Sequence, residues 1–166
     1  MILKLVGVIL FLLCGVMLGF GRVKEIKKQL SLMEDMDACL ALMESEIALC
    51  ERPLPDIFEK LSFNCSKCCS QAFWLMSEVC QNSSAAEAWR MGMESLELGE
   101  EAKKVLLSLS GILGVTEGRR QSGEIVNTRN VLSSIMEKQR RLLAEKGKSY
   151  PLLGFCFAGI AALILI

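Results

Sequence analysis

The sequence predicts an all-α protein, an antiparallel helical bundle between an N-terminal and a C-terminal transmembrane helix. Three observations lead to this fold class. Both ends of the chain are apolar, with one charged side chain in residues 1–21 and none in residues 149–166. Between them, apolar residues recur at steps of three and four, as on one face of a helix. No stretch shows the alternation of apolar and polar residues that is typical of a strand.

The first apolar segment, residues 1–21, is predicted to be a transmembrane helix that the mature protein retains. It offers about 20 apolar positions, enough to cross roughly 30 Å of hydrocarbon. The alternative is a cleaved signal peptide or a lipid-modified Cys14. However, the apolar run continues beyond Cys14 to Phe20, and Leu13 stands where a lipoprotein site requires a small residue. A retained helix is therefore the simpler interpretation.

The domain between the two spans, residues 22–149, is predicted to begin with a long helix. Its apolar face is formed by Ile26, Leu30, Met33, Met36, Leu40, Met43 and Ile47. Pro53 is expected to end this helix, whereas Pro55 suits the first turn of the next one. Shorter helices are predicted over 55–62, 66–80, 85–97 and 100–113, with Ser83 and Ser84 as capping candidates and Gly114 as a terminator.

A last long helix is predicted to start near Thr116 and to run towards the second span, residues 150–166. The alternative for this span, which is short, is a buried terminal helix of a soluble core. Because both long helices would be fixed to one bilayer, they are expected to run antiparallel, with the short helices at the far end.

Basic residues flank both apolar segments and predict the orientation in the membrane. They are Arg22, Lys24, Lys27 and Lys28 after the first span, and Lys138, Arg140, Arg141, Lys146 and Lys148 before the second. Cationic flanks are retained in the cytoplasm. We therefore expect a cytoplasmic domain that is tethered at both ends and has reduced cysteines.

Acidic residues gather in the part of the domain that lies far from the predicted membrane. Residues 34–101 hold fourteen Asp and Glu against four Lys and Arg. For any single carboxylate a solvated surface position is the simpler interpretation. A whole region of one sign instead predicts a surface that attracts a basic protein partner. The candidate docking residues are Glu44, Glu46, Glu51, Asp56 and Glu59.

The residue types offer little for catalysis. The chain has no histidine, so the usual general base near neutral pH is missing. Four cysteines, Cys65, Cys68, Cys69 and Cys80, resemble a ligand set for zinc or an iron–sulfur cluster, but they include a single C-x-x-C pair. We expect no catalytic site, no cofactor, no metal and no nucleic-acid partner; a membrane-tethered thiol or metal-binding protein is the alternative function.

The order of these parts resembles the stage III sporulation protein AB family of endospore-forming bacteria, over nearly the full chain. The most specific stretches are E-I-x-x-x-x-x-P-L-P, from Glu46 to Pro55, and L-G-x-x-[DE]-x-x-x-Q, from Leu113 to Gln121. Glu117 stands where the family more often has Asp, and the cysteine cluster is not a feature of the family.

The resemblance implies a helical cytoplasmic domain similar to type II secretion F proteins. It implies a platform, not an enzyme, in the channel between mother cell and forespore, beside a secretion-type ATPase, stage III sporulation protein AA. Other channel membrane proteins are further implied partners, and a homo-oligomer is left open. The location would be the mother-cell membrane around the forespore.

Overall fold

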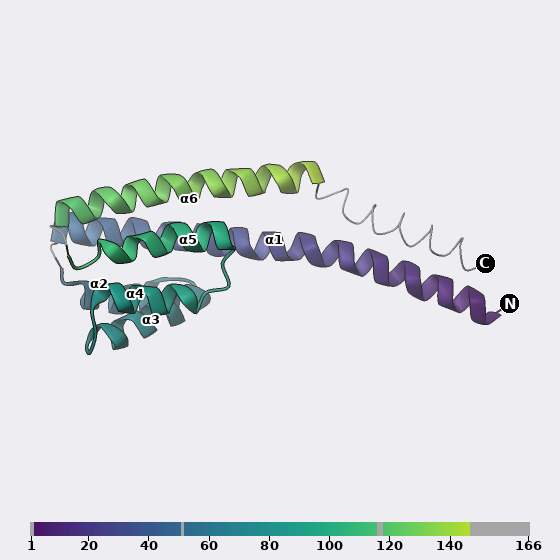
Figure 1. The fold of residues 1–166 in the computed structure, drawn as a ribbon, viewed down its shortest axis with the longest axis horizontal. Helices are drawn as coiled ribbons and strands as arrows, with labels where there is room; N and C mark the ends of the chain where they lie inside the picture. Colours follow the sequence, from purple (N-terminus) through teal and green to yellow (C-terminus); the bar gives the residue numbers. More distant parts are fainter. Residues whose placement is uncertain (1, 51, 116–117, 147–166) are drawn as a thin grey trace. The chain divides into compact units, whose positions relative to one another are not determined.

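All elements of the described structure are helical. The computed structural model describes residues 2–50, 52–115 and 118–146, and the side chains of Met17 and of residues 23–49, 52–115 and 118–145. The elements are α1 (Ile2–Cys50), α2 (Leu54–Asn64), α3 (Lys67–Cys80), α4 (Ala85–Glu94), α5 (Glu100–Ser108), the 3-10 helix η1 (Leu109–Gly111) and α6 (Gly118–Lys146) (Figure 1). The predicted all-α fold class is confirmed for these residues.

The chain divides into two compact units. The larger is Ser31–Glu137, called here the helical domain, and the smaller combines Met1–Leu30 with Lys138–Ile166. The described part of the smaller unit consists of the first part of α1 and the last turns of α6. Within the described residues, no helix has both the length and the apolar composition needed to cross a membrane. The predicted span 150–166 lies outside these residues, as do most side chains of the predicted span 1–21.

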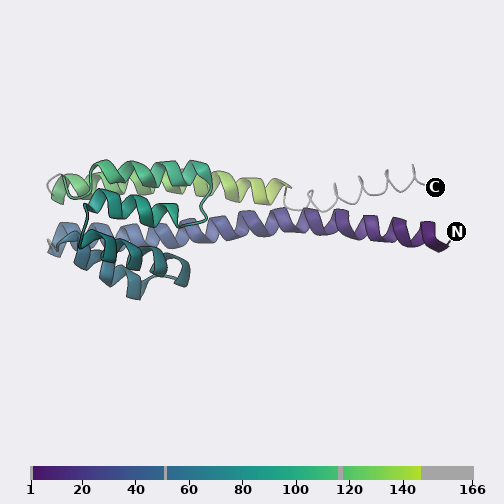
Figure 2. The same ribbon diagram turned by 60° about the horizontal axis from the view of Figure 1, so that its bottom comes forward.

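Inside the helical domain, α1 and α6 run antiparallel (Figures 1 and 2). Gly118 at the start of α6 lies beside Ile47 near the end of α1, and Arg129, three turns later, pairs with Asp37, three turns earlier on α1. The face of α1 predicted to be apolar is buried at Met33, Met36, Leu40, Met43 and Ile47. The helical period of α1 is thus confirmed within the domain.

The boundaries of the shorter helices follow the expected signals. Pro53 precedes α2 with an extended backbone, and Pro55 lies in the first turn of α2. The hydroxyl of Ser84 accepts a hydrogen bond from the backbone N–H of Glu87, which caps α4. Gly114 has a φ of 78°, a left-handed conformation that glycine adopts without strain, and it separates η1 from α6.

An aromatic cluster forms the centre of the domain. Phe58 of α2, Phe73 of α3 and Trp89 of α4 are fully buried, and their ring centroids lie 6.2 to 6.4 Å apart. The indole N–H of Trp89 donates a hydrogen bond of 2.7 Å to the carbonyl oxygen of Leu106 in α5. The cluster thereby joins four helices, and its single polar hydrogen is satisfied.

Helices α3 and α4 approach each other closely at Gly92. A Cβ atom at this position would overlap the side chain of Met76 and lie 3.1 Å from the carbonyl oxygen of Ala72. Glycine at this position therefore lets α4 pack directly on α3 and places Trp89, one turn earlier, against Phe73.

Candidate functional site

Two of the carboxylates predicted to bind a partner form ion pairs inside the domain. The first is Glu44 of α1, whose Oε2 lies 3.0 Å from Nη1 of Arg129 in α6. The same guanidinium donates from Nε to Asp37 Oδ1 at 3.0 Å and from Nη2 to Asp37 Oδ2 at 3.4 Å. These hydrogen bonds, the one to Asp37 above all, raise the pKa of Arg129. One arginine thus bridges α1 and α6 through two carboxylates.

The second is Glu46 of α1, which pairs with Lys60 of α2 and with Arg52 in the segment between these helices. Its Oε2 lies 3.3 Å from Nε of Arg52. The hydrogen bond from Lys60, together with the charges of both partners, lowers the pKa of Glu46 below its ordinary value. Glu46 therefore serves to attach α2 to α1.

The remaining predicted docking residues are placed differently. Asp56 and Glu59 lie on the exposed face of α2, and the described residues contain no ion-pair partner for either of them. Glu51 lies outside the described residues. Of the five predicted carboxylates, the structure thus leaves two exposed on α2, and these form the candidate functional site.

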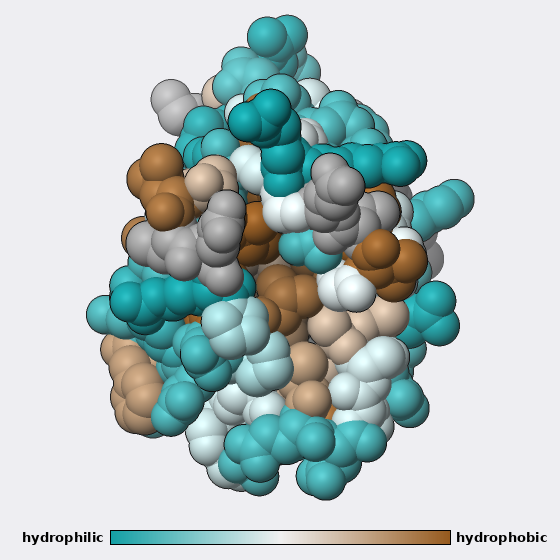
Figure 3. All heavy atoms as spheres, turned by 90° about the vertical axis from the view of Figure 1, so that its left-hand side faces the viewer, coloured by the Kyte–Doolittle hydropathy of each residue, from teal (hydrophilic) through white to brown (hydrophobic). Residues whose placement is uncertain are grey.

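The end of the domain where α1 stops and α6 starts carries positive as well as negative charge. A cavity of about 560 Å³ lies there, lined by Ile47, Ala48, Arg52, Gly118, Arg119, Gln121 and Ser122. Figure 3 views this end and shows hydrophilic side chains around a hollow with an apolar floor. The region expected to be acidic therefore carries charges of both signs here, because the start of α6 brings Arg119 to the same cavity as Arg52.

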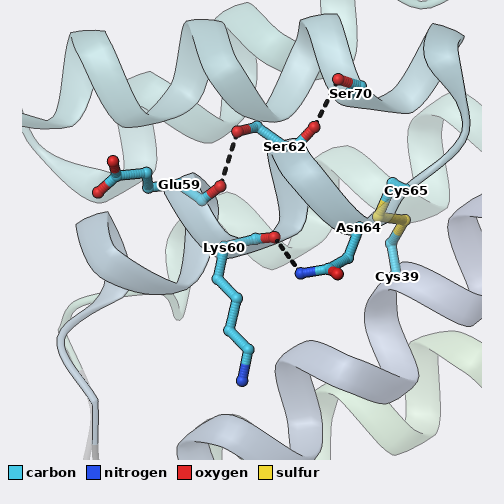
Figure 4. The surroundings of a disulfide bond; sticks show 7 residues. All are labelled: Cys39, Glu59, Lys60, Ser62, Asn64, Cys65 and Ser70. Carbon is cyan, nitrogen blue, oxygen red and sulfur yellow. Dashed lines mark hydrogen bonds between the residues drawn. A yellow bond between two sulfur atoms is a disulfide. The ribbon is translucent and has the colours of Figure 1, made fainter.

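The oxidation state of two cysteines differs from the prediction. Cys39 of α1 and Cys65, between α2 and α3, form a disulfide with a Cα–Cα distance of 6.5 Å, so the prediction that all cysteines are reduced is wrong for this pair (Figure 4). Cys39 was overlooked because it sits on the buried face of a helix, 26 residues from its partner. Cys68 is free and exposed; Cys69 is free and buried, and burial raises its pKa to about 11.

The four cysteines proposed as metal ligands do not converge. Cys65 is bonded to Cys39, and among the described residues no three His, Cys, Asp or Glu side chains could hold a metal ion together. A thiol at the raised pKa of Cys69 carries little thiolate, the form that binds metals. The described geometry therefore gives no support to the alternative function.

The basic residues predicted to flank the membrane all belong to the smaller unit. Lys24, Lys27 and Lys28 are exposed on α1, and Arg140 and Arg141 are exposed on α6. The side chains of Arg22 and Lys146, and the whole of Lys148, lie outside the described residues. Their role at a membrane surface stays a prediction.

Sequence reasoning missed Arg129 and the exposed aromatic residues Phe63 and Trp74. Arg129 lies 85 residues after Glu44, and no local pattern links the two. For Trp74 a signal existed, because a helix that buries Ala72, Phe73 and Met76 turns residue 74 towards the opposite side.

Comparison with known proteins gives one match. The model of the family described as stage III sporulation protein AB (spore_III_AB) matches residues 4–166, almost the whole chain. No curated protein and no solved structure matches the chain.

Proposed function

The chain belongs to the stage III sporulation protein AB family, and from this premise we propose that it is a membrane-anchored platform in the channel between mother cell and forespore. In this role it docks the secretion-type ATPase of the same system, stage III sporulation protein AA, and contacts other channel membrane proteins. Family membership supports the role in sporulation. The platform and its docking function rest on the residues discussed below.

One observation carries the docking proposal. Asp56 and Glu59 project from a helix that the aromatic cluster fixes in the domain, and no described cation neutralises them. A single carboxylate on a protein surface is usually solvated, so the lack of a partner does not by itself indicate a docking site. Here, however, the nearby Lys60 is turned to Glu46 instead, so the α2 face keeps its negative charge. A fixed surface of one sign suits the attraction of a basic partner.

We also propose that the chain is not an enzyme. Glu44, Glu46 and Arg129 are titratable groups with described partners, and their ion pairs join α1 to α2 and α6. Groups that hold helices together in this way give a rigid scaffold, the property that a platform requires.

The proposed anchoring rests on the sequence of the two ends, residues 1–21 and 150–166, with the domain on the cytoplasmic side. This orientation conflicts with a persistent Cys39–Cys65 disulfide, because cytosolic thiols are kept reduced.

The orientation can be tested through Cys68, which is free and exposed. We would label a variant in which Cys68 is the single cysteine, in intact cells, with membrane-permeant and impermeant thiol reagents. The proposed topology predicts labelling by the permeant reagent alone. Ready labelling by the impermeant reagent would contradict it and would agree with a stable disulfide.

The docking proposal is tested by measuring the affinity of the full-length protein, reconstituted in lipid nanodiscs, for the purified ATPase. The affinity should fall strongly between about 0.1 M and about 1 M salt, because the screening length shrinks from about 10 Å to about 3 Å. An absence of binding at the lower salt concentration would reject the proposed function.

A further inference from the structure

Two aromatic side chains lie exposed on α2, which carries the candidate site, and on the adjacent α3. Phe63, near the end of α2, is 79% exposed, and Trp74, in the middle of α3, is 57% exposed. Apolar side chains that gather on one surface mark interaction sites, and tryptophan is enriched among the residues that contribute most to protein interfaces. These two positions therefore call for a functional explanation beyond the carboxylates.

Both aromatic residues lie on the same side of the α2–α3 pair as the free carboxylates. The facing sides of these helices are marked by the contact of Phe58 with Phe73 and by the hydrogen bond from the Ser70 hydroxyl to the Ser62 carbonyl oxygen (Figure 4).

Each residue of a helix turns by about 100° from the one before. On α2, Glu59 follows Phe58 and Phe63 follows Ser62, and both of these preceding residues face α3. On α3, Trp74 follows Phe73 and lies four residues after Ser70, and Phe73 and Ser70 both face α2. The two helices are antiparallel, joined by the short turn at Cys65 and Ser66, so these rotations lead to the same side of the pair. The exposed stripe on α2 continues to Asp56, and that on α3 continues to Glu78.

We propose that this surface, the α2–α3 face (Asp56, Glu59, Phe63, Trp74 and Glu78), docks a protein segment that presents lysine or arginine side chains around an apolar side chain. The inference rests on the proposed function and specifies it: the aromatic residues anchor the partner, and the carboxylates select its charge. An arginine of the partner would also be attracted to the face of the Trp74 ring.

Charge identifies the occupant. The described residues give no ion-pair partner to any of the three carboxylates of the face. Lys67 is exposed two turns before Trp74, on the same side of α3, and this single cation leaves the carboxylates of the face in excess. A membrane surface with anionic lipids would repel the α2–α3 face. A symmetric contact between two copies of the chain would place the same carboxylates against each other. A basic protein segment satisfies both the carboxylates and the aromatic residues.

The test uses the full-length protein in nanodiscs and the purified ATPase as the probe. We expect Trp74→Ser and Phe63→Ser each to weaken binding about 10-fold or more, at both salt concentrations, because the lost contact is apolar. Trp74→Tyr should retain most of the affinity. The matched controls are Met91→Ser on α4 and Val131→Ser on α6, which lose exposed apolar side chains elsewhere and should change the affinity less than about 2-fold.

The outcomes separate the two proposals. If the wild-type protein binds the ATPase and both serine variants bind like the controls, the α2–α3 face is not the docking surface, while the proposed function stands. If the wild-type protein does not bind, the proposed function fails, and this inference fails with it. Thermal unfolding of each variant, which should match the wild type, shows that a loss of binding does not reflect a loss of fold.

Discussion

Two helix pairs of the domain, α1–α6 and α2–α3, use charged side chains in opposite ways. Between α1 and α6, Arg129 contacts both Asp37 and Glu44, and all three side chains are about 70% buried. On the α2–α3 face, Asp56 and Glu59 are exposed and lack a described cation. The contrast teaches that an acidic residue is a candidate for docking a partner where the fold brings no cation to it. A count of charges along the sequence cannot make this distinction.

The largest expected effect comes from the core that supports the α2–α3 face. Trp89→Ala removes a fully buried ring, contacts to two phenylalanines and the hydrogen bond to Leu106. We expect the free energy of unfolding to fall by about 3–5 kcal/mol, as for other buried aromatic residues. Denaturant unfolding measures the change. Trp74→Ala, at the exposed tryptophan, is the matched control, and equal losses for the two variants would contradict the assigned core.

The next effect tests the α1–α6 pair. Arg129→Met leaves Asp37 and Glu44 without their shared cation while keeping the length of the apolar stem. We expect the free energy of unfolding to fall by about 1–2 kcal/mol, a value between those for exposed ion pairs and for buried charged hydrogen bonds. Arg120→Met, at an exposed arginine near the start of the same helix, should cost less than about 0.5 kcal/mol. Equal stability of the two variants would mean that Arg129 does not link the helices.

A pH titration examines the attachment of α2 to α1. Lys60 and Arg52 hold the pKa of Glu46 below its ordinary value of 4.5. A carboxyl group whose pKa is lower in the folded than in the unfolded state stabilises the fold above the unfolded value, and this contribution disappears as the pH falls through the folded value. The wild type should therefore be more stable than Glu46→Gln at neutral pH, and the difference should shrink below about pH 4. A difference that stays constant down to pH 2 would exclude this ion pair as its source.

Much of the fold follows from local patterns in the sequence. The spacing of apolar residues at three and four positions correctly predicted the buried face of α1. Ser84 predicted the start of α4, and Gly114 predicted the break before α6. These features depend on neighbouring residues, so they can be read from one sequence. The first turn of α6, predicted near Thr116, appears at Gly118.

The candidate site was only partly predictable, because its character depends on distant residues. Glu44 and Glu59 each follow a buried apolar residue on a helix, but the packing of α6 brings Arg129 to the first and no described cation to the second. The Cys39–Cys65 disulfide likewise depends on where the turn after α2 meets α1. Long-range contacts of this kind leave no local periodicity or capping signal.

The smallest expected effect on stability concerns the α2–α3 face itself. Asp56→Asn and Glu59→Gln remove charges that have no described ion-pair partner. Each should change the free energy of unfolding by less than about 0.5 kcal/mol, and added salt should not alter this result. A loss close to that of Arg129→Met would show that these carboxylates serve the fold and are not kept free for a partner.

The central claim, that the α2–α3 face carries the docking charge and the α1–α6 pair does not, is tested most directly by comparing two double variants in ATPase binding. Asp56→Lys with Glu59→Lys reverses the face, and Asp37→Asn with Glu44→Gln neutralises the carboxylates of the pair. With full-length protein in nanodiscs at about 0.1 M salt, we expect the first variant to lose at least about 10-fold in affinity and the second, at a temperature where it is folded, to bind like the wild type. Wild-type affinity of the first variant together with weakened binding by the second would contradict the claim.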